Sequence, residues 1–345
     1  MITLTIDGKQ ITAHAEETIL QSALRNQIRI PTLCYHKKMS PIGSCRVCMV
    51  KVKGVEKPMA ACTTPALDGM EVYTHTEQII ELRRMAIRMM LINHPLDCHV
   101  CEASGACSLQ DLAYEYDVAE HGFGEVPVQR KVGPYATPLI AYDPDKCVLC
   151  LRCIHACKEI KQVEALSIGL RGSLAHVMGD PDRCISCGEC WHVCPVGALS
   201  QDLTDPPMRL HQMEKVETTC SYCGVGCQME LRVRDGKVWG VTTNDHAGPN
   251  KGSLCVKGRF GFDFINHPER LTRPLIKKNG RFREVSWDEA LGFAAKGLKE
   301  IRSTSGPDAV MGFSSARCTN EENYLFQKFM RAGVGTNNVD HCARL

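Results

Sequence analysis

The sequence predicts a modular α+β protein, in which small cysteine-rich domains precede an α/β domain. Three observations support this prediction. The 345 residues include 21 cysteines, most of them in groups with spacings of two or three residues. Residues 143–201 contain two similar stretches, DPDKCVLCLRCIHACKEI and DPDRCISCGECWHVCPVGAL, and such self-similarity indicates two copies of one small unit. Strand-like and helix-like patterns also alternate in the first and last parts of the chain.

Composition excludes several classes of protein. The formal charge is +2 and the pI is near 7.8, whereas a dedicated nucleic-acid surface is usually strongly basic. No apolar run reaches the ~18 residues of a membrane span. The first residues, MITLTIDGKQITAHAEETIL, lack the features of a signal peptide and a twin arginine. We therefore expect a cytoplasmic protein with no nucleic-acid partner and no membrane span.

The first elements follow from local patterns. Two short strands flank Asp7-Gly8, a hairpin signal. A helix is expected from about Glu17. The residues expected on its apolar face are Ile19, Leu20, Ala23 and Leu24. A cysteine-rich loop, residues 34–48, and the strand CMVKVKG come next.

An amphipathic helix is expected in TEQIIELRRMAIRMMLINHP, ending near His94-Pro95 because the residue before proline disfavours the α region. Its expected apolar face consists of Ile79, Leu82, Met85, Met89 and Ile92. Its expected solvent side consists of Arg83, Arg84 and Arg88. The glycine- and proline-rich residues 118–138 are typical of a connector.

The later part of the chain reads as a linker at 203–217, a strand-rich module from Lys215 to about Asn266, and then helix, Gly-Pro turn and strand. The last three elements open an α/β domain. The predicted domains are 1–78, 79–118, 138–204, 215–271 and 272–345.

The cysteines are expected to bind metal or clusters. Without a signal peptide the thiols stay reduced, and their spacings are too tight for a disulfide framework. Both repeats fit C-x2-C-x2-C-x3-C, the bacterial ferredoxin run, whose fourth cysteine binds the other cluster. One 4Fe–4S set is then Cys147, Cys150, Cys153 and Cys194. The other is Cys184, Cys187, Cys190 and Cys157. Zinc, the alternative, usually takes two C-x2-C pairs separated by a longer loop.

Three further groups follow. Cys34, Cys45, Cys48 and Cys62 fit a 2Fe–2S module or a zinc site. The second group is His94, Cys98, Cys101 and Cys107. In it, imidazole can replace a thiolate on iron, although a histidine at a helix end can also simply face the helix dipole. Cys220, Cys223, Cys227 and Cys255 fit a 4Fe–4S site or a zinc ribbon. Cys318 and Cys342 remain, and we expect both to be small buried residues.

The order of these motifs resembles known families. Residues 1–205 resemble the electron-input arm shared by iron–iron hydrogenases and NAD-linked formate dehydrogenases, and distantly the large peripheral subunit of respiratory complex I. In that arm the histidine of H-x3-C-x2-C-x5-C is a cluster ligand, which implies the same role for His94. The resemblance implies one 2Fe–2S cluster and, with the last group, four 4Fe–4S clusters.

Residues 215–345, with CSYCGVGC, CVKGRFG and SSARCTNEENYLFQKFMR, resemble the molybdopterin oxidoreductases, above all the catalytic subunit of cytoplasmic NAD- or ferredoxin-linked formate dehydrogenase. Lys257 falls on the family's lysine between the 4Fe–4S cluster and a pterin; alternatively, it is a solvated surface residue. The resemblance implies formate oxidation at a Mo- or W-bis-MGD centre in the full-length protein. It also implies a flavin, NADH-binding, ferredoxin or hydrogenase partner.

In that family the segment resembling DHCARL is followed at once by the Mo or W ligand, a cysteine or selenocysteine. This chain stops at Leu345, so the ligand is expected next and no catalytic residue within the chain. We hypothesise a selenocysteine codon, UGA, read as stop, which the downstream DNA would test. The chain as given is then not competent for formate oxidation. The alternative is a stand-alone electron-transfer subunit of a hydrogenase or NADH-linked complex.

Overall fold

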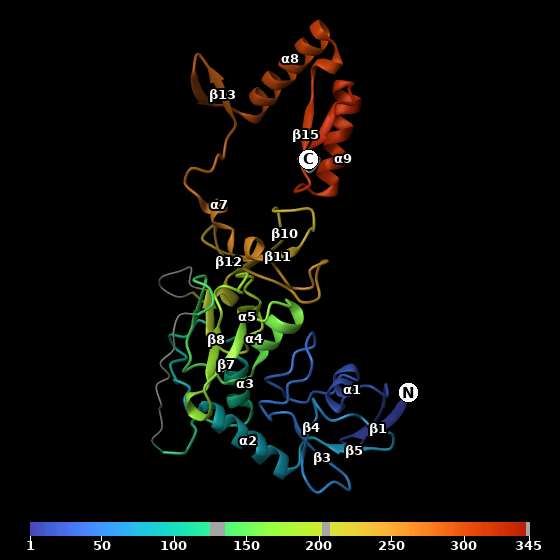
Figure 1. Ribbon diagram of the computed structural model, residues 1–345, viewed down its shortest axis with the longest axis vertical. Helices are drawn as coiled ribbons and strands as arrows, with labels where there is room; N and C mark the ends of the chain where they lie inside the picture. Colours follow the sequence, from blue (N-terminus) through green and yellow to red (C-terminus); the bar gives the residue numbers. More distant parts are fainter. Residues whose placement is uncertain (125–134, 202–207, 343–345) are drawn as a thin grey trace. The chain divides into compact units, whose positions relative to one another are not determined.

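The computed structural model describes residues 1–124, 135–201 and 208–342 (Figure 1). The chain divides into two compact units, Met1–Gln212 and Met213–Leu345. Each unit combines short helices with small sheets, as the sequence predicts.

The first unit begins with a five-stranded sheet in the order β2-β1-β5-β3-β4. Its strands are β1 (Ile2–Ile6), β2 (Lys9–Ala13), β3 (Met49–Val52), β4 (Met59–Ala60) and β5 (Glu71–Tyr73). The predicted hairpin is confirmed: β1 and β2 are antiparallel, and the turn residues Asp7 and Gly8 have φ of 47° and 80°. Positive φ at both positions is what a two-residue hairpin turn requires.

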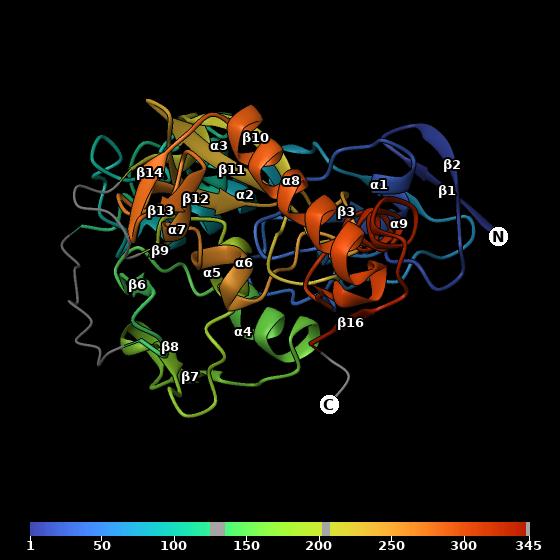
Figure 2. The ribbon, with the colours of Figure 1, turned by 90° about the horizontal axis from the view of Figure 1, so that it is seen from above.

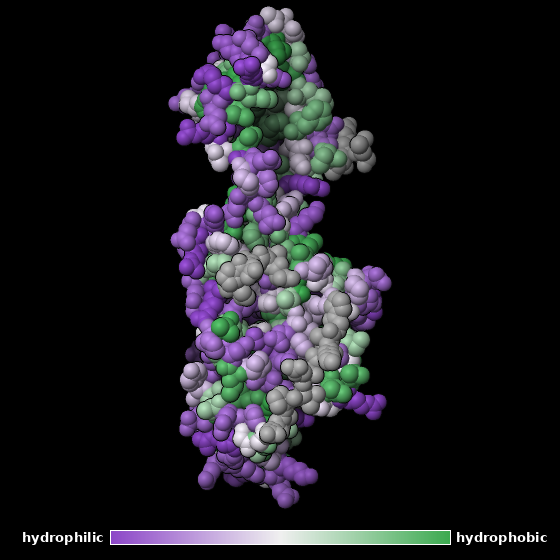
Figure 3. All heavy atoms as spheres, turned by 90° about the vertical axis from the view of Figure 1, so that its left-hand side faces the viewer, coloured by the Kyte–Doolittle hydropathy of each residue, from purple (hydrophilic) through white to green (hydrophobic). Residues whose placement is uncertain are grey.

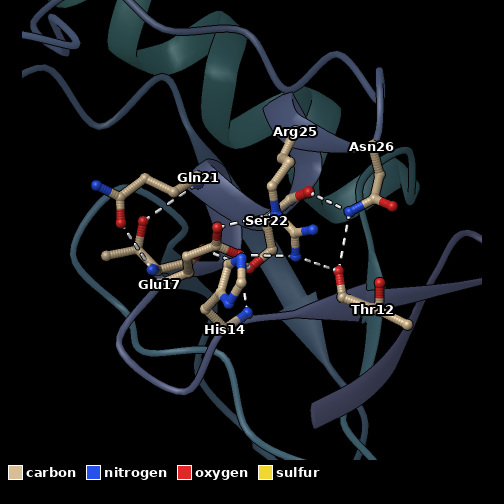
Figure 4. A network of polar contacts seen from close by, with 8 residues as sticks. Thr12, His14, Glu17, Gln21, Ser22, Arg25 and Asn26 are labelled. Atoms are coloured by element: carbon tan, nitrogen blue, oxygen red, sulfur yellow. Dashed lines mark hydrogen bonds and ion pairs between the residues drawn. The ribbon is translucent and has the colours of Figure 1, made fainter. Parts of the chain in front are cut away.

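Helix α1 (Ile19–Arg25) packs on this sheet and has a capped start. The Thr18 hydroxyl accepts from the Gln21 N–H, and the Gln21 side chain accepts from the Thr18 N–H, which satisfies two otherwise unpaired donors. Glu17, just before the N-cap, accepts from Arg25 at 2.9 Å, so the segment that leads into the helix is joined to its last turn (Figure 4).

Three of the four residues predicted for the apolar face of α1 are buried, and Leu24 is not. Ile19, Leu20 and Ala23 are buried, but Leu24 is 48% exposed. Leu24 lies in the last turn of this seven-residue helix, where its side chain is left partly uncovered.

Helix α2 (Glu77–Leu91) buries a face that shares only Ile79 with the predicted one, and it buries Arg83, which was expected on the solvent side. Its buried residues are Ile79, Arg83, Ile87 and Leu91. The predicted apolar residues Leu82, Met85 and Met89 are 38%, 40% and 63% exposed. The buried stripe repeats every fourth residue and includes an arginine, so the apolar pattern alone pointed to the wrong face. The helix also ends at Leu91, before the predicted His94.

A pair of substitutions tests this orientation of α2. Ile87→Ala leaves a cavity in the core and is expected to cost about 2–5 kcal/mol of stability. Met89→Ala, on the exposed face, is expected to change stability by about 0.5 kcal/mol or less. Urea denaturation of the two cluster-loaded variants measures both. Equal losses would contradict the observed orientation.

The rest of the first unit contains the repeat, together with α3 (Ser108–Glu115), η2 (Gly172–Leu174) and η3 (Leu210–Gln212). The elements of the repeat are β6 (Ile140–Tyr142), α4 (Arg152–His155), η1 (Ala156–Ile160), β7 (Leu166–Gly169), β8 (His176–Gly179), α5 (Glu189–His192) and β9 (Leu199–Gln201). Strand β6 pairs with β9, and β7 with β8, all antiparallel. Each copy is thus strand, helix, strand, which confirms the internal repeat. Most of the predicted connector 118–138 lies outside the described residues.

The two copies share an unusual backbone conformation. Leu149 and Leu151 have φ of 51° and 66°, and the equivalent Ser186 and Gly188 have 53° and 72°. Left-handed residues at these places turn the backbone around successive cysteines and lead into α4 and α5. The repeat therefore extends to the geometry of its cysteine loops.

The second unit starts with the predicted strand-rich module, followed by α6 (Val256–Phe260) and α7 (Asp263–Asn266). Strands β10 (Glu214–Thr219), β11 (Gln228–Arg234) and β12 (Lys237–Thr242) form an antiparallel sheet (Figure 2). The predicted linker 203–217 is too long, because its last four residues belong to β10; residues 202–207 lie outside the described part of the chain.

The predicted helix, turn and strand are confirmed as α8 (Trp287–Ser305), η4 (Pro307–Ala309) and β15 (Gly312–Ser314). The neighbouring elements are β13 (Leu275–Lys278), β14 (Arg281–Glu284), α9 (Asn320–Lys328), η5 (Phe329–Val334) and β16 (Val339–His341). Strands β15 and β16 are parallel. No residue of α8 is buried, and apolar side chains are visible on the surface of this segment (Figure 3).

Candidate metal centres

The first cysteine group converges beside the five-stranded sheet. The backbone N–H groups of Cys34 and Cys45 each point to the other's sulfur, at 3.4 and 3.5 Å. Cys48 immediately precedes β3, and Cys62 follows β4. The side chains of Cys48 and Cys62 form a hydrogen bond with each other. The charges of Cys34 and Cys45 also act on Cys62. The structure therefore brings all four predicted ligands together.

Hydrogen bonds between these thiols separate their pKa values. The bond from Cys34 lowers the pKa of Cys45 to about 6, and the same bond raises that of Cys34. Likewise, the bond from Cys48 lowers the pKa of Cys62 and raises that of Cys48. One sulfur of each pair is thus predisposed to the thiolate form, which is the form that binds metal.

The second group surrounds a cavity of about 360 Å³ that is lined by His94, Cys98 and Cys107, among others. Burial raises the pKa of Cys107, and the charges of Cys101 and Cys98 raise it further. The pKa of His94 is lowered, chiefly by burial. Its Nδ1 is buried without a hydrogen-bond partner among the described residues. A neutral imidazole with an unpaired nitrogen fits a ligand of iron.

Sequence reasoning missed an arginine at this site. Arg209 donates from Nε to the Cys101 carbonyl at 3.2 Å, and from Nη2 to the carbonyls of Cys98 and His99 at 3.3 and 2.9 Å. It lies far along the chain, in the segment read as a linker, so no local pattern pointed to it. Gly197 also approaches closely: a Cβ there would lie 2.6 Å from the Cys101 sulfur.

The repeat brings together the crossed ligand sets that the ferredoxin spacing predicts. One small cavity is lined by Cys147, Cys150, Cys153 and Cys194. A second is lined by Cys157, Cys184, Cys187 and Cys190. Burial raises the pKa of Cys150, Cys153 and Cys190, and neighbouring sulfurs add to the effect. Unpaired thiolates would be costly in such enclosed places, whereas metal-bound thiolates have their charge compensated.

Two tyrosines missed from the sequence lie against these sets. The rings of Tyr135 and Tyr142 are 5.5 Å apart. Burial raises the pKa of both hydroxyls, with the charge of Cys190 acting on Tyr135 and that of Cys147 on Tyr142. The Tyr142 hydroxyl accepts from the Val177 N–H at 3.1 Å. Tyr142 helps line the cavity of the first set, and Tyr135 helps line that of the second.

The last group lies in the second unit, at the edge of its three-stranded sheet. Cys220 donates its backbone N–H to the Cys227 carbonyl at 2.8 Å. Burial raises the pKa of both thiols, and the charges of Cys223 and Cys255 also contribute. A Cβ at Gly258 would lie 3.5 Å from the Cys220 sulfur, so the helix α6 packs its backbone against the group.

Lys257 lies on α6 and is exposed. Its side chain is two residues after the predicted ligand Cys255, which starts that helix. The proximity of Lys257 to Cys255 follows directly from the sequence. A role of Lys257 in an electron path stays a prediction.

The two remaining cysteines differ from expectation. Cys318 is half-buried, and Cys342 is exposed, with its sulfur 3.4 Å from the Ser315 hydroxyl. The predicted burial of Cys342 is wrong, because this residue follows the short strand β16 and few other residues cover it. Nearby, Ser314, Arg331 and His341 help line a polar cavity of about 630 Å³.

Two findings concern what the described residues lack. In residues 1–124, 135–201 and 208–342, no three His, Cys, Asp or Glu side chains are arranged to hold a single metal ion. Sulfurs that bind different irons of a cluster need not converge on one point. Over the same ranges, no helix combines the length and apolar character needed to cross a membrane.

Family comparisons match the order of these sites. Residues 1–77 match the 2Fe-2S iron-sulfur cluster binding domain, and 83–121 match the NADH-ubiquinone oxidoreductase-G iron-sulfur binding region. Residues 177–200 match the 4Fe-4S binding domain. Residues 213–267 match the molybdopterin oxidoreductase Fe4S4 domain, and 270–345 match molybdopterin oxidoreductase. The chain therefore combines domains for 2Fe–2S and 4Fe–4S clusters with the start of a molybdopterin oxidoreductase domain.

The chain is also similar to several individual proteins. The chain is 44% identical to NADPH-Fe(3+) oxidoreductase subunit alpha of Geobacter sulfurreducens, covering 100% of this chain and 40% of the relative. It is 33% identical to a Staphylococcus aureus protein named provisionally as a formate dehydrogenase, over 99% of this chain and 39% of that one. It is similar to a chain of an NAD+-reducing [NiFe]-hydrogenase structure, with TM-score 0.54 and 32% identity over 58% of this chain and 87% of that chain.

Proposed function

We propose that this chain conducts electrons through five iron–sulfur clusters, between a partner subunit and a molybdenum or tungsten centre of the complete protein. The observation that carries the proposal is the convergence of the cysteines into five groups. The two sets of the repeat lie close enough to interact, because the charge of Cys190 acts on the Cys153 thiol of the other set. Bound clusters would supply one-electron redox chemistry at these places.

We assign the ligands as the sequence predicts. The 2Fe–2S cluster takes Cys34, Cys45, Cys48 and Cys62. The four 4Fe–4S clusters take His94 with Cys98, Cys101 and Cys107; Cys147, Cys150, Cys153 and Cys194; Cys157, Cys184, Cys187 and Cys190; and Cys220, Cys223, Cys227 and Cys255. The corresponding domains are 1–78, 79–118, 138–204 and 215–271, followed by 272–345.

The protein's own part is to hold sulfurs, exclude water and place hydrogen-bond donors. Backbone N–H groups point to sulfur in the first group, as in the pair Cys34 and Cys45. Such bonds stabilise the reduced, more negative cluster and raise its potential. The polar cavity beside Arg331 lies at the carboxyl ends of the parallel strands β15 and β16, where α/β sheets bind ligands. We assign it to part of a bis-MGD cofactor, with Lys257 between that cofactor and the last cluster.

The partner is proposed to be a subunit that binds flavin and NAD(P)H, ferredoxin, or a hydrogenase. The name of the Geobacter relative and the likeness to the hydrogenase chain support this class of partner. Formate is the proposed substrate of the complete protein, supported by the resemblance of CSYCGVGC and SSARCTNEENY and by the name of the Staphylococcus relative. We also propose a cytoplasmic location, which agrees with these proposed partners.

A second candidate is a stand-alone electron-transfer subunit without its own catalysis. The similarity to 87% of a hydrogenase chain favours it. Formate-dependent reduction of a viologen dye by the complete protein separates the two. Activity that is lost without Mo or W supports the first proposal. Its absence in a protein loaded with every cluster and with Mo or W supports the second.

The electron path itself is tested on the reconstituted chain. After photochemical reduction with a deazaflavin, mixing with a one-electron oxidant is expected to reoxidise all clusters in one connected process. Freeze-quench EPR follows each cluster. A cluster that stays reduced while the others are oxidised would contradict a continuous path through it.

His94 offers a sharper test of ligation. The variant His94→Cys is expected to keep a 4Fe–4S cluster but lower its potential by on the order of 100 mV, because thiolate adds negative charge where imidazole had none. EPR-monitored redox titration measures the shift. In His94→Ala the cluster is expected to be lost or converted. An intact cluster at unchanged potential in both variants would show that His94 is not a ligand.

A further inference from the structure

Arg83, in the middle of α2, is a fully buried charged residue. Its side chain is 0% exposed. Nε donates to the Val47 carbonyl at 3.0 Å, Nη1 to the Tyr116 hydroxyl at 2.9 Å, and Nη2 to the Met49 carbonyl at 2.9 Å. All three nitrogens are therefore satisfied, and the arginine joins β3 to the segment after α3.

The acceptors of Arg83 are neutral. Among the described residues no carboxylate forms an ion pair with it. The Arg83 charge lowers the pKa of Glu115, but that carboxylate is held by Arg29, with Nη1 and Nη2 at 2.8 and 2.5 Å from its two oxygens. Burying a cation without a counter-charge is strongly unfavourable. Apart from this carboxylate, which Arg29 already holds, the described residues offer Arg83 no ion-pair partner.

The loop that carries Cys45 and Cys48 directly adjoins Arg83. Val47 lies between Cys45 and Cys48, and Met49 follows Cys48 directly. Two of the three Arg83 donors are thus bound to the backbone that carries two predicted ligands. Cys34 and Val47 also belong to the same buried core cluster as Ile87 of α2. A cluster held by four thiolates has net negative charge.

We propose that Arg83 is the buried counter-charge of the 2Fe–2S cluster and a positioning residue that raises its reduction potential. The inference rests on the ligand assignment Cys34, Cys45, Cys48 and Cys62 made above. One-electron reduction adds one negative charge to the cluster and neither makes nor breaks a bond. A fixed positive charge in a region of low dielectric stabilises that reduced form. Through Val47 and Met49, Arg83 also fixes the cysteine loop against α2.

The test compares three variants of the reconstituted chain: Arg83→Met, Arg83→Lys and Arg88→Met. Dithionite supplies the electrons, and EPR-monitored titration gives the midpoint potential of the 2Fe–2S cluster. Arg83→Met is expected to shift it to lower potential, and Arg83→Lys to shift it less because the charge is kept. Arg88→Met is the matched control: Arg88 is on the same helix, partly exposed and paired with Glu81 at 3.5 Å. It is expected to leave the potential unchanged.

The possible results are distinguishable. A wild-type potential in Arg83→Met with the cluster present, or equal shifts in Met and Lys variants, would overturn the role of charge. If Arg83→Met fails to assemble the cluster, Arg83→Lys decides: assembly near the wild-type potential supports the inference, and a failure in both variants overturns it. Absence of a 2Fe–2S signal in the unsubstituted chain would instead contradict the proposed ligand set.

Discussion

Replacing Cys194 with alanine is expected to remove the cluster bound by the first repeat, not the one bound by its own. Its sulfur lies in the cavity lined by Cys147, Cys150 and Cys153; the charge of Cys194 acts on the Cys150 thiol, and that of Cys147 acts on Cys194. The variant is expected to lose about four irons per chain. EPR of the reduced protein identifies which signal disappears.

The matched variant is Cys157→Ala, at the equivalent place in the other copy. Its sulfur lines the cavity of Cys184, Cys187 and Cys190, so the other 4Fe–4S signal is expected to disappear. If each variant instead loses the cluster of its own repeat, the crossed assignment is wrong. Loss of both signals in both variants would point to joint assembly of the two copies.

Removing iron from the chain is expected to lower the stability of the first unit. Cys34, Cys48 and Cys62 are 1%, 1% and 0% exposed, and the cavities of the repeat place several more sulfurs in the interior. Without metal these groups lose their binding free energy, which is also folding free energy. The melting temperature of the first unit is expected to fall by roughly 10 °C or more.

The measurement is anaerobic thermal unfolding by far-UV circular dichroism before and after chelation, with re-addition of iron and sulfide as the control. Recovery of the original transition attributes the loss to the clusters. An unchanged melting temperature in iron-free protein would mean that the apolar cores alone hold these domains, which contradicts the account.

Cysteine spacing made much of the site predictable. Ligands of a tight C-x2-C-x2-C run are local, so Cys147, Cys150 and Cys153 were grouped from sequence alone, and the ferredoxin rule added the distant Cys194. The hairpin at Asp7 and the order of elements were also predictable, because turn chemistry and strand length are local properties. The family comparisons match the iron–sulfur and molybdopterin oxidoreductase domains, whereas formate as a substrate stays a proposal.

The missed features depend on tertiary contacts. The buried face of α2 was predicted from its apolar residues, and Arg83 was predicted to be exposed. Nothing in the sequence shows that two backbone carbonyls and a tyrosine hydroxyl accept hydrogen bonds from Arg83 in the folded protein. Arg209 reaches the Cys98 loop from a segment more than a hundred residues later, so no periodic pattern could reveal it. Lys146 is the basic residue before Cys147, a position that is also basic in the second repeat. Its ion pair with Asp97, at 3.2 Å, could be found only in the structure.

The central claim is that the cysteine groups hold five iron–sulfur clusters that conduct electrons. The most direct measurement is the iron, acid-labile sulfide and zinc content of the anaerobically reconstituted chain, with spin-counted EPR after reduction. The account predicts about 18 irons and about 18 sulfides per chain, from one 2Fe and four 4Fe centres. A colourless protein with zinc and few irons would contradict it.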